Sequence, residues 1–425
     1  MDRIATVILA AGKGTRMKSD LTKVLHPLLG PPMLAYTIDL SLNGVQAEKT
    51  IVVIGHQAEK IEQTFKDSRI EFVRQEEPLG TGHAVLQVLP LLDGFAGTVL
   101  ILCGDVPLVK PETLRSFMGT FWRNDSTLAV LTAVVRDPFG YGRIIRNAEG
   151  WLERIVEEKD ASEEERLIRE INTGIYCVRS SFLIEGLKEI GRENAQGEYY
   201  LTDLAEVARK RGLRCSAHIV GDPMEVMGIN TRLDLATAME VLRQEKVREL
   251  MLSGVTVIDP KTTYVDRTVV IGKDTTLYPN CTLQGHTRIG ERCLIEPYSK
   301  ISDSEIGHEV TIRSHSVILE SRIEDGATIG PFVHLPPQSE VKAKAKIADF
   351  VEVKQSDINR KAKADCLSSI EGIPMKEEFP MGPRSSLPSD PQRKNRLIKR
   401  AKQKPLSGPR KKKKTRPQGL KQKKG

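Results

Sequence analysis

The apolar positions of the first 230 residues alternate between two patterns. Short, nearly continuous apolar runs, typical of parallel strands covered on both faces, are separated by stretches with the spacing of helices. This alternation predicts an α/β sheet with helices on both faces, in which ligands bind beyond the carboxyl ends of the strands. The runs span residues 4–10, 49–55 and 98–104, and the helical stretches span residues 32–42, 58–65 and 82–92.

A six-residue period replaces this pattern in the second half of the chain. Residues 231–253 are rich in Leu, Glu, Arg and Met and predict one long helix that links two domains. Beyond it, one apolar residue recurs at every sixth position with two slips of one residue, which indicates a parallel β-helix rather than a β-sandwich. The repeat is assigned to residues 254–358, and its apolar positions are Ile271, Leu277, Leu283, Ile289, Ile295, Ile301, Ile306, Ile312, Ile318, Ile323, Ile329, Leu335, Val341, Ile347 and Val353.

The last part of the chain, residues 359–425, is crowded with Lys, Arg and Pro and shows no six-residue period. The net charge of the chain is +8, but 16 of its 64 Lys and Arg residues lie in 393–425, which contains no Asp or Glu. The rest of the chain sets 48 basic against 56 acidic residues and carries −8. We therefore expect a disordered basic tail on a mildly acidic body with no nucleic-acid surface of its own.

The six cysteines are scattered and form no C-x-x-C pair. This argues against a structural zinc site and suits a reducing cytosol. The amino terminus leads directly into an apolar run without the features of a signal peptide. No apolar stretch approaches the ~20 residues that a membrane span needs, so a cytoplasmic location without a membrane span is expected.

The first loop has the composition of a phosphate-binding loop. It reads L-A-A-G-K-G-T-R-M over residues 9–17, and Lys23 follows. Glycines let backbone N–H groups approach a phosphate, and Arg and Lys supply the opposite charge. Met17 stands where a Walker A loop and the dinucleotide fingerprint each require glycine. On this loop alone an ordinary turn remains an alternative.

Further motifs follow this loop in a defined order. They read R-Q-E-E-P-L-G-T-G-H-A, G-D-V-P-L, G-Y-G-R-I, I-V-E-E-K-D-A, I-N-T-G-I-Y, N-A-Q-G-E-Y-Y-L-T-D and G-I-N-T-R. Together with the hexapeptide repeat, they resemble the bacterial bifunctional N-acetylglucosamine-1-phosphate uridylyltransferase and glucosamine-1-phosphate acetyltransferase family. The resemblance covers residues 3 to about 358. It implies a Rossmann-like nucleotidyltransferase domain over residues 1–230 and a shortened left-handed β-helix after it.

The resemblance implies that N-acetylglucosamine-1-phosphate attacks the α-phosphorus of UTP and releases pyrophosphate. Nucleophile and leaving group are both anionic, so positioning and charge neutralisation replace an acid–base pair. By the same resemblance Arg16 and Lys23 neutralise the triphosphate. Asp105 and Asn230 jointly hold Mg²⁺, an ion suited to hard oxygen ligands; on sequence alone, a turn or cap role for Asp105 is an equal alternative. The implied backbone contacts to substrate come from Leu9, Ala10, Ala11, Gly12, Cys103 and Gly104.

The base-reading and sugar-binding residues are also implied by the resemblance. A side-chain amide offers both a donor and an acceptor to a pyrimidine edge, a carboxylate accepts from sugar hydroxyls, and glycine allows a sugar to approach the backbone. The positions that match uracil recognition are Gln75, Gly80 and Thr81, and those that match sugar binding are Gly142, Glu157 and Asn172.

Four residues near these motifs are given no ligand role. His26, His56 and His83 are assigned structural roles, because the reaction needs no titrating imidazole. Thr22 departs from the family, which has proline just before the lysine. We expect this departure to loosen the loop without removing a ligand.

The acetyltransferase half departs further from the family. The family's H-L-R-P appears as H-L-P-P, with Pro336 in place of the Arg, whereas Lys354 is retained. Cys366 and Ser369 replace the family's catalytic His and its Tyr, and a thiol does not serve as an imidazole base for an amine proton. We therefore expect acetyl transfer to be lost. A shifted reading frame or a truncated gene would also produce so abrupt a change.

Two alternatives stay open at this point. One is a sister nucleotidyltransferase for another base or sugar, against which Gln75 and N-A-Q-G-E-Y-Y argue. The other is a non-catalytic hexapeptide scaffold whose basic tail binds a polyanion such as RNA, against which Asp105 argues. The family's β-helices form trimers through their flat faces, so the resemblance implies a homotrimer; the alternative that a shortened β-helix trimerises poorly stays open.

Overall fold

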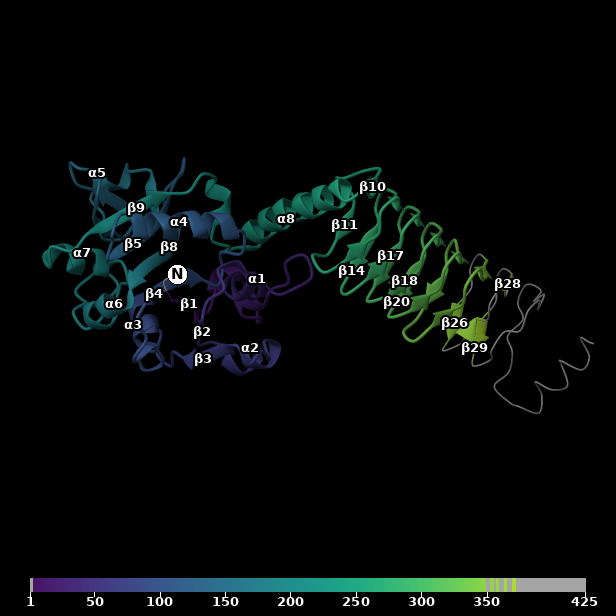
Figure 1. The fold of residues 1–425 in the computed structure, drawn as a ribbon, viewed down its shortest axis with the longest axis horizontal. Coiled ribbons are helices and arrows are strands. Elements are labelled where there is room, and N and C mark those ends of the chain that lie inside the picture. Colours follow the sequence, from purple (N-terminus) through teal and green to yellow (C-terminus); the bar gives the residue numbers. More distant parts are fainter. Residues whose placement is uncertain (1–2, 349–351, 355–356, 359–362, 365–368, 372–425) are drawn as a thin grey trace, which may run out of the picture. The chain divides into compact units, whose positions relative to one another are not determined.

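The computed structural model describes residues 3–348, 352–354, 357–358, 363–364 and 369–371 (Figure 1). It contains two compact units, which are Met1–Val270 with Thr282–His286, and Ile271–Cys281 with Thr287–Gly425. Most of the predicted basic tail, including all of 372–425, lies outside the described residues. Among the helices of the described part, none has the length and apolar character that a membrane crossing requires.

A nine-stranded sheet forms the centre of the first unit. Its strands are β1 (Ile4–Ala10), β2 (Lys49–Ile54), β3 (Ile70–Arg74), β4 (Thr98–Cys103), β5 (Leu128–Val134), β6 (Arg143–Arg146), β7 (Leu152–Val156), β8 (Glu170–Arg179) and β9 (Cys215–Ile219). Their order is β3-β2-β1-β4-β8-β5-β9, and β6 pairs with β7 and β8. β1 to β4 pair in parallel as predicted, whereas β8 runs antiparallel to β4 and β5. The apolar runs alone did not predict this reversal.

Helices cover both faces of this sheet. They are α1 (Met33–Asp39), α2 (Ala58–Thr64), α3 (Thr81–Leu86), α4 (Pro111–Arg123), α5 (Glu163–Arg166), α6 (Ser180–Gly186), α7 (Asp203–Lys210) and α8 (Arg232–Leu252), with short turns η1 (Thr15–Met17), η2 (Lys23–Leu25), η3 (Leu40–Gly44), η4 (Leu89–Leu92) and η5 (Pro223–Val226). Val7 and Ile8 are successive, fully buried residues of β1 that enter two different apolar clusters. One cluster includes α1, α2 and α4, and the other includes α3, α6 and α7. The continuous apolar run therefore reflects burial on both faces.

The long helix α8 belongs to the first unit. It begins with a capping box, in which Thr231 and Asp234 bond to each other's backbone N–H groups. Leu235 and Ala238 on its inner face lie in one apolar cluster with Met17 and Met33. The predicted linker helix over 231–253 is formed, but this packing groups it with the unit that precedes it.

Short parallel strands continue the chain after α8 (Figure 1). Those before or at the start of the second unit are β10 (Thr256–Val257), β11 (Tyr264–Val265), β12 (Val270–Ile271), β13 (Thr276–Leu277) and β14 (Thr282–Gln284). The others are β15 (Arg288–Ile289), β16 (Leu294–Ile295), β17 (Lys300–Ser302), β18 (Glu305–Ile306), β19 (Thr311–Ile312), β20 (Val317–Leu319), β21 (Arg322–Ile323), β22 (Thr328–Ile329), β23 (His334–Leu335), β24 (Glu340–Val341), β25 (Lys346–Ile347), β26 (Glu352–Lys354), β27 (Asp357–Ile358), β28 (Lys363–Ala364) and β29 (Ser369–Glu371). Within the second unit they stack as β13-β16-β19-β22-β25-β28, β15-β18-β21-β24-β27 and β17-β20-β23-β26-β29.

The apolar positions of the six-residue period line the inside of this stack. From Leu277 to Ile347 each of them is at most 4 % exposed, which confirms the predicted β-helix. The predicted end of the repeat at residue 358 differs from the structure, because Ala364 pairs with Ile347 and Ile370 pairs with Val353. The six-residue spacing continues through Ala364, whose small side chain hides the pattern in the sequence.

Candidate active site

The carboxyl ends of β1 and β4 lie side by side at one edge of the sheet. Leu9 pairs with Cys103, and the Gly104 N–H donates to the Leu9 carbonyl at 2.9 Å. The two loops that follow these strands therefore start from neighbouring points. This is the edge at which the sequence predicts ligand binding.

The loop after β1 is held by a glycine and a buried methionine. Gly14 has φ 62°, and a Cβ on it would lie 2.5 Å from the Cβ of Lys23, so a larger residue there would displace the lysine. Met17 is 1 % exposed, and its N–H donates to the Gly14 carbonyl at 2.9 Å. Met17, which distinguishes this loop from two better-known phosphate motifs, therefore packs in the apolar core and fixes the loop there.

Four of the predicted phosphate and metal residues converge in front of this edge. The Lys23 ammonium contacts Oδ2 of Asp105 and lies 3.1 Å from Oδ1 of Asn230. The Arg16 guanidinium donates to the same Asn230 oxygen at 2.8 Å. The Lys23 and Asp105 side chains are 13 % and 23 % exposed. Three segments far apart in the sequence thus place two cations against two oxygen donors.

The orientation of Asn230 follows from the cap of α8. Its N–H donates to Asp234 at 3.0 Å, and its side-chain Nδ2 donates to the Gly228 carbonyl at 3.3 Å. These two bonds leave Oδ1 facing Arg16 and Lys23. The Ile229 N–H donates to the Asp105 carbonyl at 2.9 Å, which ties this segment to the loop after β4.

The donor set at this point fits a divalent cation. One carboxylate oxygen and one amide oxygen meet at the same ammonium group, and both are hard donors of the kind that Mg²⁺ or a similar ion prefers. Within the described residues there is no group of three or more His, Cys, Asp or Glu side chains that could hold a metal. A site here would therefore depend on substrate phosphates to complete its ligands.

A cavity of about 210 Å³ lies next to the phosphate loop. Ala11 and Gln75 line it, together with Lys13, Gly55, His56, Ala58, Glu59, Arg74, Glu76 and Pro78. Gln75 is 7 % exposed, and its Nε2 lies 3.1 Å from both the Gly80 carbonyl and Nδ1 of His83. The amide predicted to read the base is thus held at the wall of a cavity.

Gly80 and Thr81 start α3 next to this amide. Gly80 has φ 109°, and a Cβ on it would lie 2.5 Å from the Tyr199 carbonyl oxygen. The Thr81 hydroxyl accepts from the Leu201 N–H at 3.2 Å. The segment around Tyr199, part of a separate motif in the sequence, therefore packs against the turn predicted to read uracil.

The three predicted sugar residues also come together. A Cβ on Gly142 would lie 3.4 Å from Cβ of Asn172 and 3.5 Å from Oε1 of Glu157. The Asn172 N–H donates to the Gly142 carbonyl at 2.8 Å, and the Thr202 hydroxyl donates to Glu157 at 3.3 Å. Burial raises the pKa of Glu157, and the negative charge of Asp203 adds to this.

A bulge in β8 lies next to Asn172 and contacts the end of β4 through Gly174 and Cys103. The β5–β8 register shifts between Leu131 and Thr132, opposite the stretch that begins at Asn172. Gly174 has φ 79°, and the Cys103 thiol donates to its carbonyl at 3.5 Å. Burial raises the pKa of Cys103 to about 12, so the thiol stays neutral and has a packing role rather than that of a nucleophile.

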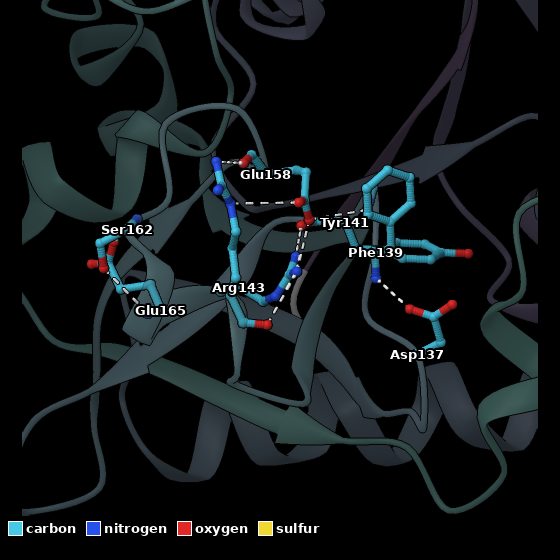
Figure 2. A network of polar contacts seen from close by, with 9 residues as sticks. Asp137, Phe139, Tyr141, Arg143, Glu158, Ser162 and Glu165 are labelled. Carbon is cyan, nitrogen blue, oxygen red and sulfur yellow. Dashed lines mark hydrogen bonds and ion pairs between the residues drawn. The ribbon is translucent and has the colours of Figure 1, made fainter.

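A buried arginine supports the loop that carries Gly142. Figure 2 shows the Arg143 guanidinium between Glu158 and the Tyr141 carbonyl. One of its terminal nitrogens donates to the Glu158 carboxylate and the other donates to the Tyr141 carbonyl. The bond to Glu158 is 2.7 Å long, and the Gly140 N–H donates to the same carboxylate oxygen at 3.1 Å. Glu158 thereby ties the loop to the strand end that carries Glu157.

Sequence reasoning missed several residues that support the site. Burial raises the pKa of the Tyr141 phenol, and the negative charges of Asp234 and Asp105 raise it further. Tyr141, Arg143 and Glu158 stand inside quoted motifs, but nothing in the spacing indicated their contacts. The three histidines given structural roles lie in different surroundings. His56 lines the cavity, His26 is buried, and His83 contacts Gln75.

Comparisons with known proteins agree with this arrangement. Residues 6–173 match the MobA-like NTP transferase domain family, and residues 268–303 and 286–320 match the bacterial transferase hexapeptide family, which has six repeats. The chain is 49 % identical to the bifunctional protein GlmU of Geotalea uraniireducens, over 87 % of this chain and 80 % of that protein. It is 48 % identical to GlmU of Geobacter metallireducens over 87 % and 81 % of the two chains. Proteins of this kind generally use a divalent metal. The chain belongs to the family of bifunctional GlmU proteins.

Proposed function

We propose that Arg16, Lys23, Asp105 and Asn230 carry the chemistry of this nucleotidyltransferase. The chain is a UDP-N-acetylglucosamine pyrophosphorylase: it transfers UMP from UTP to N-acetylglucosamine-1-phosphate and releases pyrophosphate, a step toward cell-wall precursors. The observation that supports these four residues is their convergence, in which one ammonium group contacts both oxygen donors.

The nucleotide is proposed to bind across the ends of β1 and β4. The cavity beside Gln75 takes uracil, with Gly80 and Thr81 at its edge. Backbone groups of Leu9, Ala10, Ala11, Gly12, Cys103 and Gly104 border the phosphates. Arg16 and Lys23 neutralise the charge that develops on the triphosphate oxygens, and their placement before the reaction avoids the cost of reorganising solvent. Mg²⁺, held by Asp105 and Asn230 when bound, would supply further positive charge at the phosphates.

The sugar phosphate is proposed to bind on the other side of this point. Glu157 and Asn172 offer acceptors and a donor to the sugar hydroxyl and acetamido groups, and Gly142 leaves room for the ring. Because the attacking phosphate oxygen is already anionic, no residue has to remove a proton from it. The residues of the sugar side therefore act by holding the nucleophile in line with the α-phosphorus.

The test is pyrophosphate release from UTP and N-acetylglucosamine-1-phosphate in the presence of Mg²⁺. Asp105→Ala should lower kcat by at least ~100-fold, the size expected when a preorganised charge contact is removed. Asp125→Ala is the matched control, because Asp125 forms an exposed ion pair with Arg179. Equal rates for Asp105→Ala and the wild type would refute the assigned site.

For the second half of the chain we propose that acetyl transfer is lost. This rests on Pro336 and on Cys366, which stand where the family's arginine and catalytic histidine belong; Cys366 lies outside the described residues. The purified chain should consume no acetyl-CoA with glucosamine-1-phosphate. Measurable consumption above a blank without enzyme would refute this proposal.

We further propose a homotrimer and a cytoplasmic location. Family membership and the parallel β-helix support the trimer, and light scattering of the purified chain tests it. A cytoplasmic location is supported by the unpaired thiols of Cys103, Cys177, Cys215, Cys281 and Cys293. Fractionation of cells that express the chain tests the location.

A further inference from the structure

The turn between β2 and α2 contacts the segment that carries Lys23. Gln57, the residue that caps the amino end of α2, uses both atoms of its side-chain amide for this contact. Its Oε1 accepts from the Thr22 N–H at 3.1 Å, and its Nε2 donates to the Asp20 carbonyl at 2.5 Å. One side chain thus holds two backbone groups of the segment that leads into Lys23.

The backbone of Gln57 is itself held in place. Its φ of 58° and ψ of 39° are left-handed, a conformation that residues with a Cβ rarely adopt and that persists only where the surroundings enforce it. The Gln57 carbonyl accepts from the Lys60 and Ile61 N–H groups at 3.1 and 3.2 Å. The amide therefore extends from a rigid point, the first turn of α2.

The same turn forms part of the wall of the base cavity. Gly55 and His56, which precede Gln57, line this cavity together with Gln75. A Cβ on Gly55 would lie 2.9 Å from the Ala11 carbonyl oxygen, so the turn also packs closely on the phosphate loop. Gln57 therefore connects the wall of the base cavity to the segment that carries the Lys23 ammonium.

Thr22 gives this contact its importance. Its side chain is 1 % exposed, and loss of the Gln57 acceptor would leave its N–H as a buried donor without that partner. Thr22 has φ −57°, a value that proline adopts without strain. A proline here would preserve the backbone conformation and remove the N–H group together with the threonine hydroxyl, which is buried and has no hydrogen-bond partner. Thr22 stands where the family has proline, and it thus supplies a backbone N–H donor that proline lacks.

We propose that Gln57 is a positioning residue that holds the Lys23 ammonium where UTP meets it. The proposal rests on the proposed role of Lys23 in binding the triphosphate. Gln57 touches no substrate in this assignment; it acts through the backbone of Asp20 and Thr22. Its loss should leave the fold intact and let the segment that carries Lys23 move, so the effect should fall on UTP and not on the sugar phosphate.

The kinetic test compares Gln57→Ala with Gln63→Ala, an exposed glutamine of α2. Gln57→Ala should lower kcat/KM for UTP about tenfold, the loss expected from one or two hydrogen bonds, and should change the KM of the sugar phosphate less than about twofold. Isothermal titration should give a matching loss of UTP affinity. Gln63→Ala should behave as wild type. Equal losses for both substrates, or unchanged UTP parameters, would overturn the proposal.

Amide exchange followed by mass spectrometry tests the contact without relying on activity. In Gln57→Ala, peptides covering residues 19–25 should exchange faster, while peptides from β1 should not change. Gln57→Glu keeps an acceptor for Thr22 and should retain part of the protection. If the wild type were inactive with UTP, the proposed function would fail while this measurement still reported on the contact. Unchanged exchange in Gln57→Ala would refute the contact itself.

A double-mutant cycle separates positioning from general stabilisation. Thr22→Pro removes the N–H that Gln57 binds, so Gln57→Ala in that background should cost about threefold rather than tenfold in kcat/KM for UTP. Additive losses would mean that the two residues act independently, which contradicts the proposal.

Discussion

The two proposed sides of the candidate active site, one for the nucleotide and one for the sugar phosphate, are built from different chemistry. The nucleotide side carries cations on loops at the sheet edge, and its Arg16 is exposed. The sugar side carries Glu157, whose pKa is raised by burial, among residues of β7, β8 and the start of α7. A triphosphate needs positively charged side chains that neutralise its oxygens. The uncharged ring of a sugar needs hydrogen-bond acceptors with which little water competes. The difference indicates that charge governs one side and hydrogen bonding the other.

The sharpest test of this contrast is removal of the cation on the nucleotide side. Lys23→Met should lower kcat/KM for UTP by ~100- to 1,000-fold, because a preorganised positive charge is lost from the transition state. The KM for N-acetylglucosamine-1-phosphate should change by less than about threefold. Steady-state kinetics with each substrate varied in turn measures both effects.

The matched control for this variant is Lys18→Met, an exposed lysine of the same loop. It removes the same charge from the surface and should leave kcat/KM for UTP within about twofold, since exposed charges are screened. A similar loss in both variants would mean that net charge near the loop, and not the contact with Asp105 and Asn230, governs UTP binding.

A substitution on the sugar side should affect the sugar phosphate and leave UTP binding unchanged. Glu157→Gln keeps the shape of the side chain but weakens its acceptor and adds a donor, so the KM for N-acetylglucosamine-1-phosphate should rise ~10-fold. The KM for UTP should stay within about twofold. Glu164→Gln, a change of an exposed glutamate in α5, is the control. A rise in the UTP KM of similar size would erase the distinction between the two sides.

Much of the architecture could be predicted from the sequence. Burial on both faces makes β1, β2 and β4 continuous apolar runs, and one inward residue per strand makes the β-helix a six-residue period. Antiparallel β8 was missed, because its direction depends on pairing with distant strands and leaves no local signal. The strand at Ala364 was missed because an alanine at the apolar position of a six-residue period resembles a loop residue in the sequence.

The site itself was predicted through motifs more than through chemistry. Asp105 and Lys23 are 82 residues apart in the sequence, and only the fold brings them together. The supporting contacts of Gln57 and Glu158 could not be foreseen, since each links a side chain to backbone groups whose positions depend on the folded loops. Motifs therefore supplied the residues that we propose contact substrate, whereas the residues that hold them in place depend on packing.

A smaller effect is expected from the pair that supports the sugar loop. Glu158→Gln removes the negative partner of the buried Arg143 and weakens the acceptor for the Gly140 N–H. The free energy of unfolding should fall by about 1–3 kcal/mol, because the buried Arg143 charge loses the stronger, charged partner of its hydrogen bond. The KM for the sugar phosphate should rise about threefold, because the loop that carries Gly142 is less well held. Denaturant titration and kinetics measure the two changes.

An effect on UTP binding of the same size would contradict this assignment. Arg146→Gln is a useful comparison, since Arg146 lies on the same strand, β6, as Arg143, and its ion-pair partner is Glu170 at the start of β8. It should reduce stability without changing the KM for the sugar phosphate. Together the two variants separate support of the loop from general stability of the sheet.

The smallest expected effect concerns Asp203, at the start of α7. Burial raises its pKa to about 6, and the charges of Glu206 and Asp160 act in the same direction, although the helix N-terminus favours a carboxylate. Above pH 6 the ionised group therefore weakens the folded state relative to the unfolded one, in which the ordinary pKa is about 3.8. As the pH falls from 6 to 4 the folded state gains a proton that the unfolded state does not, so this destabilisation disappears.

Asp203→Asn should accordingly stabilise the protein at pH 7.5 by on the order of 1 kcal/mol, a figure reduced by solvent screening of a partly exposed group. The two proteins should become equally stable near pH 4, so the difference must shrink across the window from pH 6 to 4. Thermal unfolding at several pH values checks this. A difference that stayed constant with pH would mean that the substitution acts through packing or capping of α7, and not through the raised pKa of Asp203.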